Sequence, residues 1–146
     1  MKKICTLIII CLFSLSVTQA RNEFSRNIAD LPSPAQTLIS KDFKAKLSLI
    51  KIEKTIGRVA QYEVILDDGT EINFDTKGNW TDIEVRLGKK VPDSIVPREI
   101  LDYVKKNCKN KKIIGIEKNR KDYEIELEDG SELKFDRAGN FLRYSN

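Results

Sequence analysis

The chain has 146 residues, of which 40% are hydrophobic and 33% are charged, and it contains no histidine. This composition is typical of one ordinary globular unit and excludes the disordered and fibrous classes. The net charge of +4 is the small difference between 26 basic and 22 acidic residues. A nucleic-acid-binding protein would need a basic stripe, so we expect no nucleic-acid partner.

The first twenty residues have the pattern of an export signal. Lys2 and Lys3 precede an apolar run over residues 4–17, and Thr18 and Ala20 supply the small residues of a cleavage site. The run is shorter than the about 20 apolar residues of a membrane-spanning helix. We therefore expect a signal peptide over residues 1–20, cleavage after Ala20, a periplasmic or extracellular protein, and no stable membrane insertion afterwards.

The cysteines predict neither a disulfide nor thiol chemistry. Cys5 and Cys11 lie in the expected signal, so Cys108 is the only cysteine of the expected mature chain. A thiol nucleophile needs a base, and the chain lacks histidine. We interpret Cys108 as a small buried hydrophobic residue. Catalysis by a Ser-His-Asp triad is excluded, zinc has no ligand set, and we expect no cofactor.

An internal repeat organises the rest of the chain. Residues 62–80 align with residues 123–141 without a gap, and ten of the nineteen positions are identical. The similarity extends upstream with small offsets. We predict an N-terminal linker over 21–30, a first copy over 31–87, a linker over 88–95 and a second copy over 96–146.

Each copy begins with a helical pattern and continues with an alternating one. A proline stands near each start, and apolar residues follow at helical spacing, as at Ala35 and Ile39 or at Ile100 and Val104. The later alternation of apolar and polar residues predicts strands, and the Asp-Gly pairs at 68–69 and 129–130 predict tight hairpins. We therefore predict an α+β fold of two tandem repeats. Each is a helix plus a four-stranded antiparallel meander, with the sheets joined and the helices on one face.

Two aromatic residues are candidates for partner binding. Strict alternation puts Trp80 and Phe141 on the charged face of the sheet, where exposed aromatics would form an interface hot spot. The alternative is that a bulge at the start of each strand turns the aromatic side chain into the core. The partner-binding hypothesis comprises Trp80, Asp82, Glu84, Arg86, Phe141 and Arg143.

Two further groups of charged residues have alternative interpretations. Acidic residues in the turns could form a weak metal site, but an Asp before Gly is ordinary turn chemistry. The lysines of residues 105–112 complement the dipole of the second helix in a solvated turn, and the alternative is attraction to an anionic membrane surface or polymer. The turn carboxylates are Asp67, Asp68, Asp75, Glu128, Asp129 and Asp136.

The repeated motif resembles that of a known family. The pattern Asp68-Gly69…Phe74-Asp75…Gly78-Asn79-Trp80 recurs as Asp129-Gly130…Phe135-Asp136…Gly139-Asn140-Phe141. It looks like the exported PepSY-like proteins that are described as beta-lactamase-inhibitor-like. The resemblance implies a helix-plus-antiparallel-sheet fold whose tandem units bind a partner protein on the sheet surface.

We therefore predict an exported, non-enzymatic binding module that holds an unidentified protein or peptide on the open sheet face. More specifically, the resemblance implies that the binding module is an inhibitor or regulator of an envelope enzyme. The alternative from another class is an envelope scaffold or a small-ligand or metal-ion binding protein that uses the turn carboxylates.

Overall fold

The computed structural model describes residues 21–145, and the expected export signal lies outside these residues. Within that range the chain forms nine strands, two α-helices and one short 3-10 helix, an α+β fold. In chain order these are β1 (Arg21–Ser25), η1 (Ile28–Asp30), α1 (Ser33–Asp42), β2 (Leu47–Thr55), β3 (Arg58–Leu66), β4 (Glu71–Phe74), β5 (Trp80–Glu84), α2 (Arg98–Asn107), β6 (Ile113–Lys118), β7 (Asp122–Leu127), β8 (Glu132–Asp136) and β9 (Phe141–Ser145).

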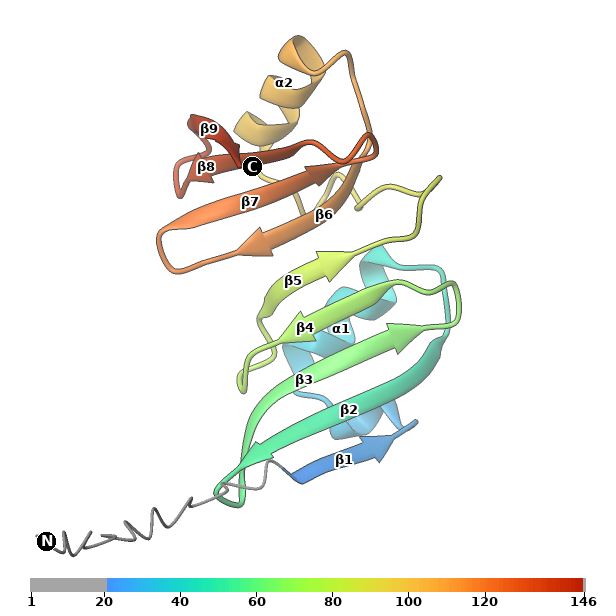
Figure 1. The fold of residues 1–146 in the computed structure, drawn as a ribbon. Coiled ribbons are helices and arrows are strands. Elements are labelled where there is room, and N and C mark those ends of the chain that lie inside the picture. Colours follow the sequence, from blue (N-terminus) through green and yellow to red (C-terminus); the bar gives the residue numbers. More distant parts are fainter. Residues whose placement is uncertain (1–20, 146) are drawn as a thin grey trace, which may run out of the picture.

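All nine strands form one antiparallel sheet in which each strand lies beside the next one along the chain (Figure 1). The strands that follow α1 meet those that follow α2 at the β5–β6 pair, where Ile83 is paired with Ile116. Both isoleucines are buried, so the apolar face of the sheet runs through this junction without a break.

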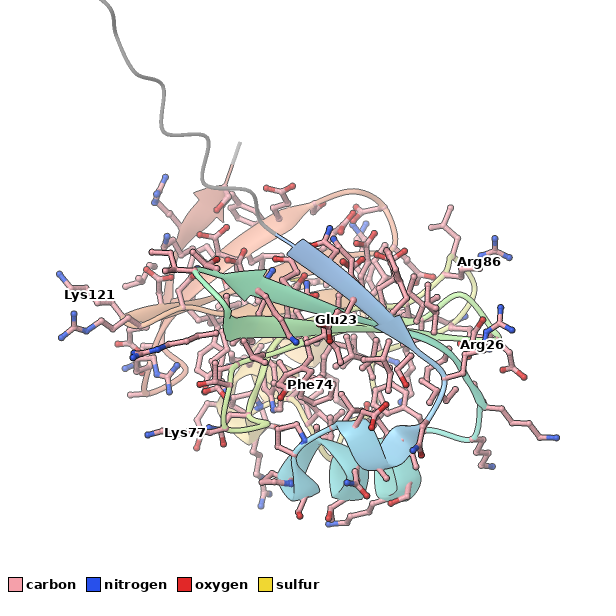
Figure 2. The ribbon with its side chains drawn as sticks, turned by 90° about the horizontal axis from the view of Figure 1, so that it is seen from below. Glu23, Arg26, Phe74, Lys77, Arg86 and Lys121 are labelled. Carbon is pink, nitrogen blue, oxygen red and sulfur yellow. The ribbon has the colours of Figure 1, made fainter. Side chains whose placement is uncertain are left out.

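Both helices pack on this apolar face. Figure 2 shows α1 on one side of the sheet, with Phe74 pointing toward it. The alternating strands direct every second side chain to the helix side, and these side chains share a single core cluster with the helices. The helices contribute the buried residues Ala35 and Ile39 from α1, and Ile100 and Val104 from α2.

The turns between strands place the helices on the sheet. Gly78 and Gly139 have φ of +83° and +85°, a conformation that favours glycine. A Cβ atom at Gly78 would lie 2.8 Å from Cβ of Pro32, and one at Gly139 would lie 2.6 Å from Cβ of Glu99. The start of each helix therefore rests directly on a turn of the sheet.

The two segments that we expected to be linkers have defined structure. Residues 21–30 contain β1, which pairs with β2 along its whole length, and η1. In the segment 88–95, Val91 is buried and its N–H donates to the carbonyl of Ile113 at 2.8 Å. Both segments are thus held against the sheet.

Candidate functional site

The face of the sheet opposite the helices carries acidic side chains in two rows that run across the strands. In the first row, Glu84 of β5 and Glu126 of β7 flank Gly115 of β6, and Glu71 and Glu132 extend the row on β4 and β8. Side chains at paired positions of antiparallel strands lie about 5 Å apart. The pairs Glu71–Glu84 and Glu126–Glu132 therefore bring like charges together.

The second row lies next to the first and has the same character. Asp82 of β5 is paired with Glu117 of β6, which in turn is paired with Glu124 of β7. Like charges at directly opposite positions destabilise a sheet. A protein that keeps four such pairs on one face sacrifices stability there, and such departures are typical of functional sites.

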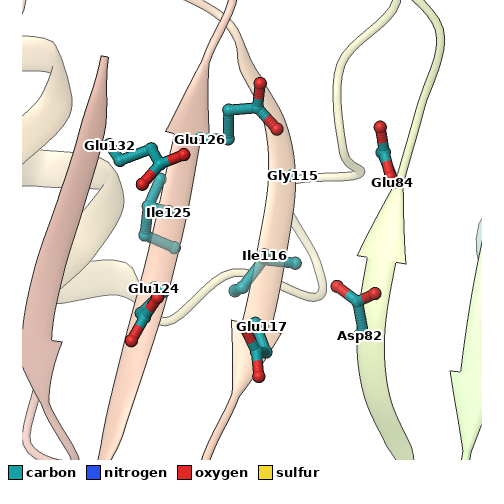
Figure 3. Close-up of a pocket in the computed structure, with 9 residues that line it drawn as sticks. All are labelled: Asp82, Glu84, Gly115, Ile116, Glu117, Glu124, Ile125, Glu126 and Glu132. Atoms are coloured by element: carbon teal, nitrogen blue, oxygen red, sulfur yellow. The ribbon is translucent and has the colours of Figure 1, made fainter. Parts of the chain in front are cut away.

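A hollow of about 140 Å³ lies between the two rows. It forms because Gly115 has no side chain, and a Cβ atom there would lie 3.1 Å from Cβ of Glu126. Figure 3 shows Glu84 and Glu126 on either side of Gly115, with Asp82 and Glu117 along the strands. We call this feature the acidic hollow; its lining residues are Asp82, Glu84, Gly115, Ile116, Glu117, Glu124, Ile125, Glu126 and Glu132.

Burial and mutual repulsion make the ionised form of several carboxylates in the acidic hollow unfavourable. Burial raises the pKa of Asp82, and the charge of Glu84 raises it further. Burial likewise raises the pKa of Glu117, with Glu124 and Asp82 adding to the rise. For Glu126, burial raises the pKa and the charges of Glu84 and Glu132 act in the same direction. A cationic group placed in the hollow would relieve this repulsion.

Lysines neutralise the carboxylates on both flanks of the face but not those at its centre. Lys51 bridges Glu53 and Glu63 at 2.7 and 2.9 Å, and Lys134 lies 2.8 Å from Glu124. Among the salt bridges of residues 21–145, none involves five of the hollow's carboxylates, namely Asp82, Glu84, Glu117, Glu126 and Glu132. Positive charge is therefore missing where the acidic side chains are densest.

The expectation that Trp80 and Phe141 stand on the open face is wrong, because a register shift directly follows each of them in its strand. The shifts put Trp80 opposite the buried Phe74 and Phe141 opposite the buried Phe135. Both aromatics consequently pack against the core on the helix side. The alternative of a bulge is the correct one, and a role of either aromatic in partner binding stays an untested prediction.

The Phe141 ring stacks on Tyr103 of α2 with a centroid distance of 4.6 Å. The Trp80 ring carries the ammonium group of Lys118 at 4.2 Å from its centroid. These contacts account for both aromatics as parts of the fold.

The other predicted site residues are distributed unevenly. Asp82 and Glu84 line the acidic hollow, and Arg143 is on the same face because it is paired with Lys134. Arg86 lies beyond the end of β5. Four further residues of the hollow were not among the predicted site residues, although the alternating glutamates of β7 indicated a charged face: Glu117, Glu124, Glu126 and Glu132.

The turn carboxylates are engaged by the backbone. Asp75 Oδ1 accepts hydrogen bonds from the N–H groups of Lys77 and Asn79, each at 2.9 Å. Asp68 Oδ1 accepts from Thr70 N at 3.0 Å, and the second copy has equivalent bonds to Asp129 and Asp136. Within residues 21–145, no group of three or more Asp, Glu, Cys or His residues is arranged to hold a metal ion.

Cys108 follows the last residue of α2, is buried, and forms no disulfide within residues 21–145. Burial raises the pKa of its thiol, which keeps the sulfur protonated and unreactive at neutral pH. Its interpretation as a buried hydrophobic residue is confirmed.

Comparisons with known proteins place the chain in a family. A family model described as "Putative beta-lactamase-inhibitor-like, PepSY-like" matches residues 60–143, which is more than half of the chain. A search of curated proteins finds no significant match. No helix of the described part, residues 21–145, is long and apolar enough to cross a membrane.

Several solved structures resemble the chain over most of its length. A Bacteroides vulgatus protein, described as a putative periplasmic protein of unknown function, is 39% identical over 86% of this chain and 100% of its own, with a TM-score of 0.80. A Bacteroides thetaiotaomicron protein, described as a putative calcium-regulated periplasmic protein, is 34% identical over 86% of this chain and 97% of its own, with a TM-score of 0.78. Another Bacteroides vulgatus protein, also described as putatively periplasmic, is 33% identical over the same shares, with a TM-score of 0.77.

Proposed function

Because the chain belongs to the PepSY-like family, we propose that it is an exported, non-enzymatic binding module that holds a partner protein or peptide on the open face of its sheet. The acidic hollow carries this proposal. It is a concave feature on a face that no helix of residues 21–145 covers, and five of its six carboxylates take part in none of the salt bridges of these residues. The complementary partner presents a lysine or arginine side chain.

The geometry also supports a shape for the bound segment. The rows of carboxylates run perpendicular to the strands, so a segment that crosses the sheet would place successive basic side chains beside Glu84 and Glu126. Asp82 in the neighbouring row and Arg143 at the flank would set its register. Binding would follow from steric and electrostatic complementarity, without a chemical step.

Residue pairings that recur in the two halves of the sheet support the proposal as well. The pairing of Tyr62 with Phe74 recurs as that of Tyr123 with Phe135, and each pair leads into a strand that starts with a register shift. We propose that residues 31–87 and 96–146 are two repeats of one unit. The acidic hollow lies where they join, so neither unit alone would form it.

The proposal also states where the protein is located and how it acts on its partner. The signal-like sequence of residues 1–20 and the relatives described as putatively periplasmic support a location in the periplasm. The family description supports inhibition or regulation of an envelope enzyme. The absence of histidine and the protonated state of Cys108 support a non-enzymatic role.

The first test is binding of a short extended peptide that alternates lysine and valine, measured by calorimetry at low salt. We expect the chain from Arg21 onward to bind this peptide and not a glutamate–valine analogue. The double variant Glu84→Gln/Glu126→Gln should bind roughly tenfold more weakly. The control Glu23→Gln/Asp102→Asn makes the same charge change outside the hollow and should bind like the wild type.

A crosslinking pull-down from envelope extract with the same variants then seeks the natural partner. A protein captured by the wild type and the control, but lost by the hollow variant, would support the proposal. Equal capture by all three folded proteins would exclude the acidic hollow as the site.

A second candidate function is ion binding through the turn carboxylates, and the relative described as calcium-regulated favours testing it. This candidate predicts that calcium raises the melting temperature and that Asp75→Asn removes the rise. An unchanged melting temperature would exclude it.

A further inference from the structure

Two segments that are distant in the sequence meet at one end of the sheet. The first is the loop 86–90 after β5, and the second is the segment 105–112 at the end of α2. Lys112 Nζ donates to the carbonyl oxygen of Gly88 at 3.2 Å, and Lys90 lines the same groove as Lys105 and Lys111. Figure 1 shows both connections on the right-hand side of the molecule.

The two segments together carry eight basic residues and no acidic one, and acidic side chains of adjoining segments offset part of this charge. Three of the lysines are neutralised, since Lys89 pairs with Asp68, Lys90 with Asp93 and Lys111 with Asp129. The other five cations take part in none of the salt bridges of residues 21–145. We call the surface that the two segments form the basic end; its cations are Arg86, Lys89, Lys90, Lys105, Lys106, Lys109, Lys111 and Lys112.

An exposed leucine, Leu87, lies between the basic residues Arg86 and Lys89. Leu87 is 77% exposed, and Gly88 beside it has a φ of +92°, which turns the chain back. The loop is held at both ends, because the N–H groups of Val85 and Val91 donate to the carbonyls of Ile114 and Ile113, each at 2.8 Å. These two hydrogen bonds to β6 therefore hold the loop that carries Leu87 in a defined position.

We propose that the basic end docks on the surface of an anionic lipid bilayer, with Leu87 inserted among the headgroups. Lysines and arginines gain electrostatic energy near anionic lipids, and an apolar side chain at the tip adds a hydrophobic contribution. An acidic protein would match the charge but would also need an apolar pocket at the position of Leu87, whereas a bilayer offers an apolar medium beneath its headgroups at every point. The acidic hollow is on the face of the sheet, whereas the basic end is at the ends of the strands, so a docked molecule keeps the hollow accessible.

The other end of the strands supplies matched controls. Ile56, 82% exposed in the β2–β3 turn, corresponds to Leu87, and Arg58 next to it is also exposed. Figure 2 shows Lys77 and Lys121 on the side of the molecule opposite to Arg86. Variants can thus remove the same number of positive charges, and one exposed apolar side chain, at either end of the strands.

The test is sedimentation of the chain from Arg21 onward with phosphatidylcholine vesicles that contain about one third phosphatidylglycerol. We expect binding at low salt, release at high salt and no binding to phosphatidylcholine alone. Lys105→Gln/Lys106→Gln/Lys109→Gln should weaken binding roughly tenfold and Leu87→Ser several-fold. The controls Lys77→Gln/Arg120→Gln/Lys121→Gln and Ile56→Ser should bind like the wild type.

Circular dichroism verifies that each variant folds, which is expected because all the changed side chains are exposed. The proposal is overturned by a failure of the wild type to bind anionic vesicles at low salt. It is also overturned if the controls weaken binding as much as the basic-end variants do, or if polyglutamate is bound and the vesicles are not.

Discussion

Asp82 illustrates how a residue of the acidic hollow can lower the stability of the fold. Its carboxylate is half-buried, and its pKa is raised by burial and by Glu84. A group with a raised folded-state pKa stabilises the fold fully below its unfolded pKa, and that stabilisation is lost as the pH rises through the folded-state value. At neutral pH the ionised Asp82 therefore lowers the free energy of unfolding.

Replacing Asp82 by asparagine should accordingly stabilise the protein at neutral pH. The amide keeps the size of the side chain and an oxygen for the Asn73 amide group, which donates to Asp82 at 3.3 Å. We expect a gain of up to about 1 kcal/mol in the free energy of unfolding, the scale of a directly opposed charge pair across two strands, measured by urea denaturation. The gain should disappear near the ordinary aspartate pKa of 3.8. The same variant should bind the lysine–valine peptide more weakly, as expected where function opposes stability.

Asp136→Asn serves as a control, because the pKa of Asp136 is shifted in the opposite direction to that of Asp82. The amide of Asn140 and neighbouring backbone N–H groups lower the pKa of Asp136. Its contribution to stability is present above the ordinary pKa and is lost as the pH falls through the folded-state value. This variant should be less stable at neutral pH, with a difference that shrinks in acid. If both variants lost stability equally, the assigned pKa directions would be wrong.

Phe141 illustrates a residue whose role changes once its side chain is placed. Its ring contacts Tyr103, Phe135 and Tyr144 with centroid distances of 4.6, 5.7 and 5.3 Å. Phe141→Ala should therefore lower the free energy of unfolding by about 2–3 kcal/mol, measured by urea denaturation. The neighbouring Leu142 is 53% exposed, and Leu142→Ala should cost less than about 0.5 kcal/mol. Equal costs would contradict the packing described for β9.

At the scale of elements, the contact between a turn and a helix can be isolated with two glycines. Gly130 and Gly139 have φ of +81° and +85°. A Cβ at Gly130 would meet no atom within 4 Å, whereas one at Gly139 would clash with Glu99. Gly130→Ala should cost about 1 kcal/mol for backbone strain, and Gly139→Ala should cost at least about 1 kcal/mol more. Thermal and urea denaturation measure both; equal losses would mean that α2 does not rest on this turn.

Most elements could be predicted because their signals are local. Alternation from Tyr62 to Leu66 identifies β3, the Asp68-Gly69 pair identifies the following hairpin, and helical spacing identifies α1. β1 could not be predicted in this way, because none of its described side chains is buried and its pattern does not alternate. Its pairing with β2 depends on the backbone of a distant segment.

The candidate site was only partly predictable for the same reason. Asp82 and Glu84 were recognised from their strand, but their opposition to Glu117 and Glu126 depends on how β5, β6 and β7 are aligned. The direction of Trp80 depends on a single register shift. One extra residue in a strand moves a side chain to the other face, and alternation alone does not show where that residue lies.

At the scale of the whole molecule, the two halves share both a sheet and a core. Three residue pairs join β5 to β6, and Ile83 and Ile116 are buried at that junction. The segment 88–95 adds the hydrogen bond from Val91 to Ile113. Separating the halves would expose this apolar surface and unpair two strand edges, so neither half should unfold alone.

We therefore expect a single cooperative unfolding transition, and one destabilising change can test it across the molecule. Trp80 is the only tryptophan and lies in the first half, so its fluorescence reports on that half, whereas far-UV circular dichroism reports on all strands and helices. Phe141→Ala acts in the last strand. If the sheet is one cooperative unit, this change should lower the urea midpoint by the same amount with both probes. A fluorescence midpoint that stays in place while the dichroism transition splits would show that the halves unfold independently. The acidic hollow, which needs Glu84 from one half and Glu126 from the other, would then be lost before the first half unfolds.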